Sequence, residues 1–132
     1  MMDTPFRMSL ERFSNATDRL REALDVPERS DLVADAIIQR FEFTFELAWK
    51  TARRRLHELG IAVHSPREAL RKCFAEGFIE EEAVWLRMLE DRNRTSHLYS
   101  AEMAREIVAR IDAYEKALRA LKDRFAAEAA GP

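Results

Sequence analysis

The chain has 132 residues, which is enough for one domain that buries roughly two-thirds of the surface exposed by its unfolded form. Its 22 basic and 24 acidic residues nearly cancel, which argues against broad electrostatic capture of nucleic acid but leaves room for a local basic patch. With only three glycines and four prolines, the composition favours an all-α fold over a β-rich one.

Cysteine usage and hydropathy favour a cytoplasmic protein without membrane association. The single cysteine, Cys73, excludes an internal disulfide. The N-terminal sequence Met-Met-Asp-Thr-Pro lacks the basic and apolar regions of a signal peptide. No apolar run approaches the length that crosses a bilayer.

The first half of the chain predicts two helices. Thr4 followed by Pro5 is a helix start, and apolar residues recur at helical spacing until Pro27. A second helix is expected from Ser30 or Asp31 to Leu59, with Gly60 as its left-handed stop. Residues 41–47 alternate like a strand, but a longer apolar stripe favours a helix there. The stripe consists of Val33, Ile37, Phe41, Thr44, Ala48, Ala52 and Leu56.

The same helix carries a charged row made of Glu42, Glu46 and Lys50, which fall at four-residue spacing. Such a row is more often a solvated or salt-bridged helix face than a functional site. Three consecutive arginines, residues 53–55, are likewise more typical of a solvated helix end than of a nucleic-acid contact.

The second half predicts three more helices. Residues 65–68, Ser-Pro-Arg-Glu, form a capping box that opens a short helix to about Glu76, with Gly77 as its stop. Another helix is expected to begin near residues 79–81, and Ser100 is expected to cap the last one, whose tail from residue 126 to 132 should fray. The inward residues of the short helix are expected to be Ala69, Leu70, Cys73 and Phe74.

These elements predict an all-α protein: an antiparallel, up-and-down helical bundle of four long helices plus one short helix. No composition shift, repeat or low-complexity segment divides the chain, so residues 1–132 are expected to form a single domain.

Most of the site-type chemistry lies between Asp91 and Ser100. On a regular helix Asn93 and Ser96 share a face with His97, whereas Arg92 lies about 140° away from His97 around the axis. Arg92 and His97 can therefore meet at one ligand only if the helix unwinds or a second chain completes the site. A two-fold dimer would place two copies of this stretch face to face.

These residue types suit phosphate chemistry. His97 can exchange a proton near neutral pH, Arg92 can clamp phosphate oxygens, and Asn93 and Ser96 can orient a ligand beside the hydroxyl of Tyr99. Metal-independent RNA cleavage, by attack of the 2′-hydroxyl, is a consistent reaction. The structural alternative is that the helix dipole alone favours basic residues here, and that the tyrosine fills the following turn.

The sequence predicts no metal site and no cofactor. His57 and His64 flank Gly60 without a carboxylate or cysteine set at metal-ligand spacing, and no glycine-rich phosphate loop is present.

The stretch resembles the Arg-x4-His-x-Tyr signature of HEPN-domain proteins, carried here by Arg92, His97 and Tyr99. Residues 39–50, Gln-Arg-Phe-Glu-Phe-Thr-Phe-Glu-Leu-Ala-Trp-Lys, are similar to the second-helix signature of one branch, the nucleotidyltransferase substrate-binding proteins. The Ser-Pro-Arg of residues 65–67 and the spacing of Trp85, Met88 and residues 92–93 extend the resemblance over nearly the whole chain.

The resemblance implies a helical bundle that forms homodimers and binds a cognate minimal nucleotidyltransferase. In the related toxin branch the dimer is a metal-independent RNase, which makes Arg92 and His97 the catalytic candidates and Asn93 a polar residue that helps shape the site. There the partner acts as antitoxin by transferring AMP to the motif tyrosine, here Tyr99; the added charge and bulk would block RNA phosphate.

Two functions therefore remain open. The chain is either the binding and regulatory subunit of a two-component nucleotidyltransferase, holding nucleotide or acceptor in a groove near Trp49, Trp85 and Tyr99, or a ribonuclease toxin that its partner neutralises. It lacks the Gly-Ser and paired-aspartate pattern of a nucleotidyltransferase, so we do not expect it to be the transferase itself.

Overall fold

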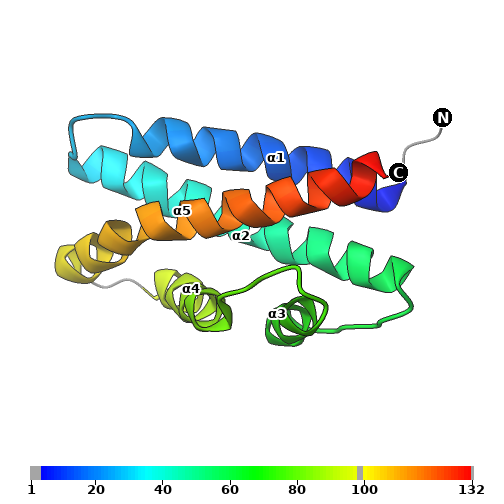
Figure 1. Cartoon of the computed structure of the whole chain (residues 1–132). Coiled ribbons are helices and arrows are strands. Elements are labelled where there is room, and N and C mark those ends of the chain that lie inside the picture. Colours follow the sequence, from blue (N-terminus) through cyan, green and yellow to red (C-terminus); the bar gives the residue numbers. More distant parts are fainter. Residues whose placement is uncertain (1–3, 98–99, 132) are drawn as a thin grey trace.

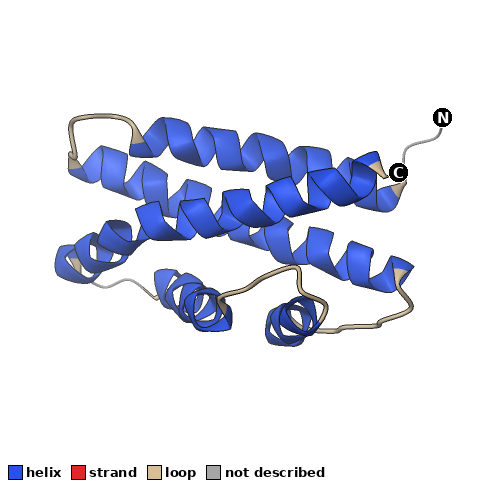
Figure 2. Ribbon diagram, in the orientation of Figure 1, coloured by secondary structure: helices blue, strands red, loops and turns tan. Residues whose placement is uncertain are grey.

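The computed structural model describes residues 4–97 and 100–131, and this part of the chain is built of five α-helices without a strand (Figures 1 and 2). The predicted all-α bundle is confirmed. The helices are α1 (Pro5–Leu24), α2 (Asp31–Glu58), α3 (Pro66–Ala75), α4 (Glu82–Thr95) and α5 (Ala101–Ala130).

Four of the five helix starts have a side-chain cap of the predicted kind. The hydroxyls of Thr4, Ser30, Ser65 and Ser100 each accept a hydrogen bond from the backbone N–H three residues later. The exception is α4, which begins at Glu82, just after the predicted start, and has no side-chain cap bond.

The stops also follow the sequence. Gly60 and Gly77, which follow α2 and α3, have φ values of 81° and 79°, where a Cβ would be strained.

The three long helices α1, α2 and α5 run side by side, and α3 and α4 lie against them on one side (Figure 1). α2 contacts all four other helices and forms the centre of the molecule. At 14 residues, α4 is half as long as α2, which has 28 residues. α4 ends at Thr95 and is followed by a turn at Ser96 and His97.

The core is aromatic and close to continuous. The α2 stripe is buried except for a half-buried Val33, and Phe41 stacks on Tyr114 of α5 with ring centroids 5.6 Å apart. Cys73 is also buried, as predicted, and its burial raises the pKa of the thiol to about 12, so it behaves as a small apolar residue. Within the part of the chain described, no helix is long and apolar enough to cross a membrane.

Two details of the prediction are wrong. Phe74 does not point inward: it is 45% exposed, because the buried face of α3 consists of Ala69, Leu70 and Cys73. The chain does not fray from residue 126, since α5 continues to Ala130 and the Arg7 guanidinium of α1 donates to a backbone carbonyl in its last turn.

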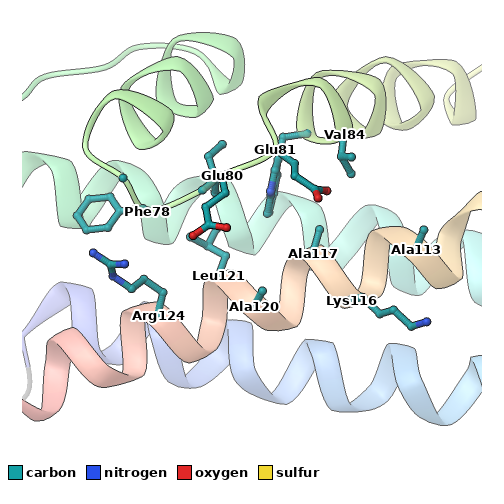
Figure 3. Close-up of a pocket in the computed structure, with 13 residues that line it drawn as sticks. Phe78, Glu80, Glu81, Val84, Ala113, Lys116, Ala117, Ala120, Leu121 and Arg124 are labelled. Atoms are coloured by element: carbon teal, nitrogen blue, oxygen red, sulfur yellow. The ribbon is translucent and has the colours of Figure 1, made fainter.

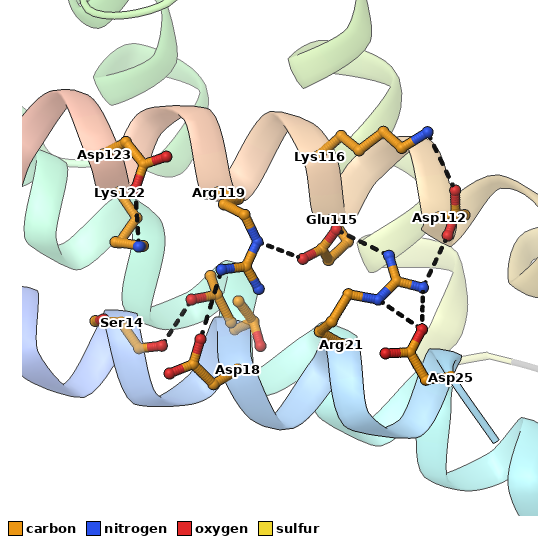
Figure 4. A network of polar contacts seen from close by, with 12 residues as sticks. Ser14, Asp18, Arg21, Asp25, Asp112, Glu115, Lys116, Arg119, Lys122 and Asp123 are labelled. Atoms are coloured by element: carbon orange, nitrogen blue, oxygen red, sulfur yellow. Dashed lines mark hydrogen bonds and ion pairs between the residues drawn. The ribbon is translucent and has the colours of Figure 1, made fainter.

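A polar network joins α1 to α5 (Figure 4). Glu115 is only 2% exposed, yet it accepts from Arg21 of α1 at 3.2 Å and from Arg119 at 2.8 Å. Arg119 also pairs with Asp18 at 3.5 Å. A buried carboxylate needs such partners, so this network fixes α5 against α1 at the middle of the bundle.

The Ser9 hydroxyl of α1 is expected to contribute about 1 kcal/mol to stability. Thr51 of α2 donates its hydroxyl hydrogen to the carbonyl of Leu47 at 2.7 Å, so Ser9 must be the donor in the buried 2.6 Å contact between Ser9 and Thr51. Ser9→Ala should lower the free energy of urea unfolding by about 1 kcal/mol relative to Ser14→Ala, which makes the same change in the same helix. Equal stability of the two variants would contradict a stabilising role for the Ser9 hydroxyl.

Candidate functional site

The predicted site residues lie where α4 ends. Arg92 and Asn93 belong to the last turn of α4, and Ser96 and His97 form the turn that follows Thr95. Tyr99, predicted as the AMP acceptor, lies outside the described residues. The site therefore begins at a helix C-terminus, where the basic side chains suit the negative end of the helix dipole.

Arg92 is directed toward α2. Its Nη2 lies 3.2 Å from Oε2 of Glu46, and Oε1 of Glu46 lies 3.4 Å from Nζ of Lys50. The side chains of Arg92 and Glu46 are 32% and 34% exposed, so the pair is partly shielded from water. Nε of Arg92 is buried and has no hydrogen-bond partner among the described residues. One donor of the guanidinium thus stays unsatisfied.

Glu46 is therefore a partner of the candidate site residue Arg92, and the sequence-based prediction left it on a charged surface row. Two residues of that row, Glu46 and Lys50, form an ion pair, as a salt-bridged row predicts. The signal that could have identified Glu46 is the joint presence of the helix-two and Arg-x4-His motifs, since a carboxylate in one and an arginine in the other are natural partners.

His97 does not face Glu46 of α2. It lines an open groove of about 440 Å³ together with Asn93 and Arg94 of α4. Arg67 of α3, Glu90 and Met103 complete the lining. Two guanidinium groups, an amide and an imidazole face one carboxylate there, which is a donor-rich arrangement suited to an anion.

The structure thus brings Asn93 and His97 together but leaves Arg92 and Ser96 out of their groove. α4 ends at Thr95, between Arg92 and His97, so the angle expected for a regular helix does not apply to the pair. Even so, Arg92 does not line the groove of His97 in the single chain.

Asp91 anchors the motif to α5, although it is not among the predicted site residues. It is 2% exposed and accepts two hydrogen bonds from Arg110, at 2.7 and 2.8 Å, and one from the Tyr114 hydroxyl. Arg94 approaches the same carboxylate at 3.5 Å. Its position between Met88 and Thr95 on the inner face of α4 was the available signal for a buried role.

These contacts shift the pKa values of Asp91 and its two partners on α5. Burial opposes the charge on Asp91, but the hydrogen bonds from Arg110 and Tyr114 outweigh it, so the pKa of the carboxyl lies below its usual value. The pKa of Arg110 is raised by its bond to Asp91. Burial, with the bond to Asp91, raises the pKa of Tyr114 to about 12. The carboxylate is therefore ionised at neutral pH and holds the end of α4 in place.

Trp49 and Trp85 line no common groove among those described. Trp85 lines a groove of about 550 Å³ between the loop before α4 and the α5 helix. In Figure 3 Glu80 and Glu81 stand on the loop side of this groove, opposite the small side chains of α5. Trp49 of α2 lines none of the grooves described, and its indole Nε1 is buried without a partner in the described chain. No groove described is lined by both tryptophans, and Tyr99 lies outside the described residues, so the groove expected near Trp49, Trp85 and Tyr99 stays a prediction.

Comparison with known proteins gives one consistent result. Residues 8–127 match the family model described as "Nucleotidyltransferase substrate binding protein like". A curated relative, "Probable ribonuclease HepT" from Haemophilus influenzae, is 35% identical over 86 residues. That match covers 61% of this chain and only 58% of the relative's length.

Two solved structures share the fold. A protein from Thermus thermophilus has a TM-score of 0.82 at 32% identity, covering 86% of this chain and 98% of that one. A Haemophilus influenzae protein, described as revealing the fold of a substrate binding domain of a nucleotidyltransferase, has a TM-score of 0.79 at 26% identity. It covers 88% of this chain and 98% of its own. The five-helix bundle is therefore the shared architecture.

Proposed function

The chain belongs to the nucleotidyltransferase substrate-binding protein family, and from that premise we propose that it is the substrate-binding and regulatory subunit of a separate minimal nucleotidyltransferase. The family match over residues 8–127 carries this proposal. The sequence is consistent with it, because residues 1–132 lack the Gly-Ser and paired-aspartate pattern of a nucleotidyltransferase. We further propose that the subunit is a homodimer in the cytoplasm.

The groove beside His97 is the proposed ligand site. Arg67 and Arg94 can contact phosphate oxygens, and Asn93 offers an amide to a sugar or phosphate. The groove is wide open, so a nucleotide or acceptor held by the partner enzyme can enter it from outside. The ligand would then be shared between the two proteins.

Neutralising the two groove arginines is expected to weaken ligand capture by the assembled pair. Arg67→Gln/Arg94→Gln removes two charge-assisted contacts, which should raise the dissociation constant for labelled ATP at least about tenfold, measured by equilibrium dialysis with the cognate nucleotidyltransferase. Arg71→Gln/Lys72→Gln, which makes the same charge change outside the groove on α3, is the control. Identical ATP affinity of the groove and control variants would contradict the assignment.

The second candidate function is a metal-independent RNase of a toxin–antitoxin pair, with Arg92 and His97 as catalytic residues, Asn93 and Ser96 shaping the site, and Tyr99 accepting AMP from the partner. Two observations favour it: the complete motif and the 35% identity to a protein named a probable ribonuclease. The separation of Arg92 from His97 in one chain adds a condition. In this function, a second copy of the chain supplies one member of the catalytic pair.

In that dimer the Arg92 guanidinium would stabilise the charged phosphorane-like transition state while His97 transfers protons. Glu46 holds Arg92 in its present orientation through Nη2. Because Nε of Arg92 is buried, such a contact would use the exposed part of the guanidinium. Both candidate functions involve the same homodimer and the same nucleotidyltransferase partner.

A further inference from the structure

Two grooves at the C-terminal half of α2 are contiguous and basic. One groove, of about 540 Å³, lies between α1 and α2 and is lined by Arg12 and Lys50. The other, of about 650 Å³, extends past the end of α2 to His57 and His64. Arg53 and Arg54 line both grooves, as does Pro5, so the two form one continuous depression.

The cations of this depression are largely uncompensated. Among the described residues, neither Arg12 nor Arg53 nor Arg54 forms an ion pair. Glu58 is the single acidic residue that lines either groove, and it pairs with Arg55 at 3.1 Å. We call Arg12, Lys50, Arg53 and Arg54 the basic strip. In a chain whose formal net charge is −2, such a concentration of positive charge, of which Lys50 alone is paired among the described residues, is a local feature.

The strip leads to the motif. Lys50 and Arg92 both pair with Glu46, through its Oε1 and Oε2 respectively, so the end of the strip is one carboxylate away from the motif arginine. Along α2 the rise from Lys50 to His57 is about 10 Å, so these basic residues are spread over a length greater than that of one phosphate group. The spacing of the charges therefore suits a chain of phosphates better than a single anion.

We propose that the basic strip binds the sugar-phosphate backbone of single-stranded RNA and guides it toward Arg92. A concave strip fits a strand better than it fits a flat lipid surface, and free guanidinium groups are the side chains that best recognise successive phosphates. This inference rests on the second candidate function for the identity of the strand.

The test is fluorescence anisotropy of a 2′-O-methylated RNA oligonucleotide of about 16 nucleotides in EDTA, a probe without the 2′-hydroxyl nucleophile, so that binding is measured without cleavage. Arg53→Gln/Arg54→Gln should weaken binding at least about tenfold at 0.1 M salt and reduce the slope of log affinity against log salt by about 1.4. Arg71→Gln/Lys72→Gln, an exposed adjacent pair outside both grooves, should leave affinity and slope unchanged.

Equal loss in the two double variants, or loss in neither, would overturn the proposal. The proposal would also be overturned if Arg53→Gln/Arg54→Gln weakened binding to polyglutamate or to phosphatidylserine vesicles but left RNA affinity unchanged. The result is separable from the RNase candidate. If the strip variant loses RNA binding but the wild type cleaves no RNA, the RNA-binding strip is supported and the RNase candidate is contradicted. If RNA cleavage requires His97 but not the strip residues, the RNase candidate is supported and the strip is contradicted.

Discussion

Replacing Asp91 with Asn is expected to lower the free energy of unfolding by about 3 kcal/mol, because the change removes the charge that two groups of α5 and one of α4 share. Asp91 is 2% exposed, and it is the carboxylate on which Arg110 and Tyr114 converge. Asn cannot accept on both of its terminal atoms, so at least one buried donor loses its partner. Urea denaturation at pH 7 measures the loss.

Glu90→Gln is the matched control, since it makes the same chemical change at the exposed neighbouring position and should stay within about 0.5 kcal/mol of wild type. The pH dependence follows from the sign of the shift. The folded pKa of Asp91 lies below its ordinary 3.8, so its contribution is complete above that value and is lost as the pH falls through the folded pKa. The gap between wild type and Asp91→Asn should therefore narrow only in acid. A gap that is absent at pH 7 would refute the anchoring role.

Subunit mixing is expected to restore RNA cleavage that two single variants have lost. If Arg92 of one copy acts with His97 of the other, Arg92→Ala and His97→Ala should each lower the cleavage rate at least about 10²-fold. Random exchange of the two variants then yields mixed dimers with one intact and one doubly mutated site, so about a quarter of all sites should be active. The assay is RNA cleavage in EDTA before and after exchange.

The control is exchange of His97→Ala with wild type. Arg92 is intact in both copies there, so about half of all sites should be active before and after exchange. A mixture of the two variants that stays as inactive as each alone would place both residues of the pair in one chain. Intact RNA with the wild type would remove the RNase candidate for that substrate and leave the nucleotidyltransferase-partner function in place.

The fold was predictable because its signals are local. Thr4, Ser30, Ser65 and Ser100 each cap a helix through their own hydroxyl, and Gly60 and Gly77 each stop one by adopting positive φ. The apolar stripe of α2 overrode the strand-like alternation because burial on a 3.6-residue period decides the element. The prediction that Phe74 points inward was wrong because the apolar pattern of a short helix does not tell how wide a face its neighbours cover.

The site was predictable only in its residues and not in its contacts. The spacing argument assumed one helix through Arg92 and His97, but α4 ends at Thr95. Glu46, 46 positions earlier, pairs with Arg92 through a tertiary contact that no local pattern encodes. Asp91 and Arg110 are joined across two helices in the same way. Arg53 and Arg54 were assigned to a solvated helix end, and the structure adds that both line the same continuous depression.

The most direct test of the central claim is whether the purified chain forms a stable complex with its cognate minimal nucleotidyltransferase. Light scattering behind size exclusion, at protein concentrations of about 10 μM, should show one species whose mass contains both proteins, as a dissociation constant of about 1 μM or tighter requires. Two separate species, each with the mass of its own protein alone, would contradict the assignment of this chain as the partner subunit of a nucleotidyltransferase.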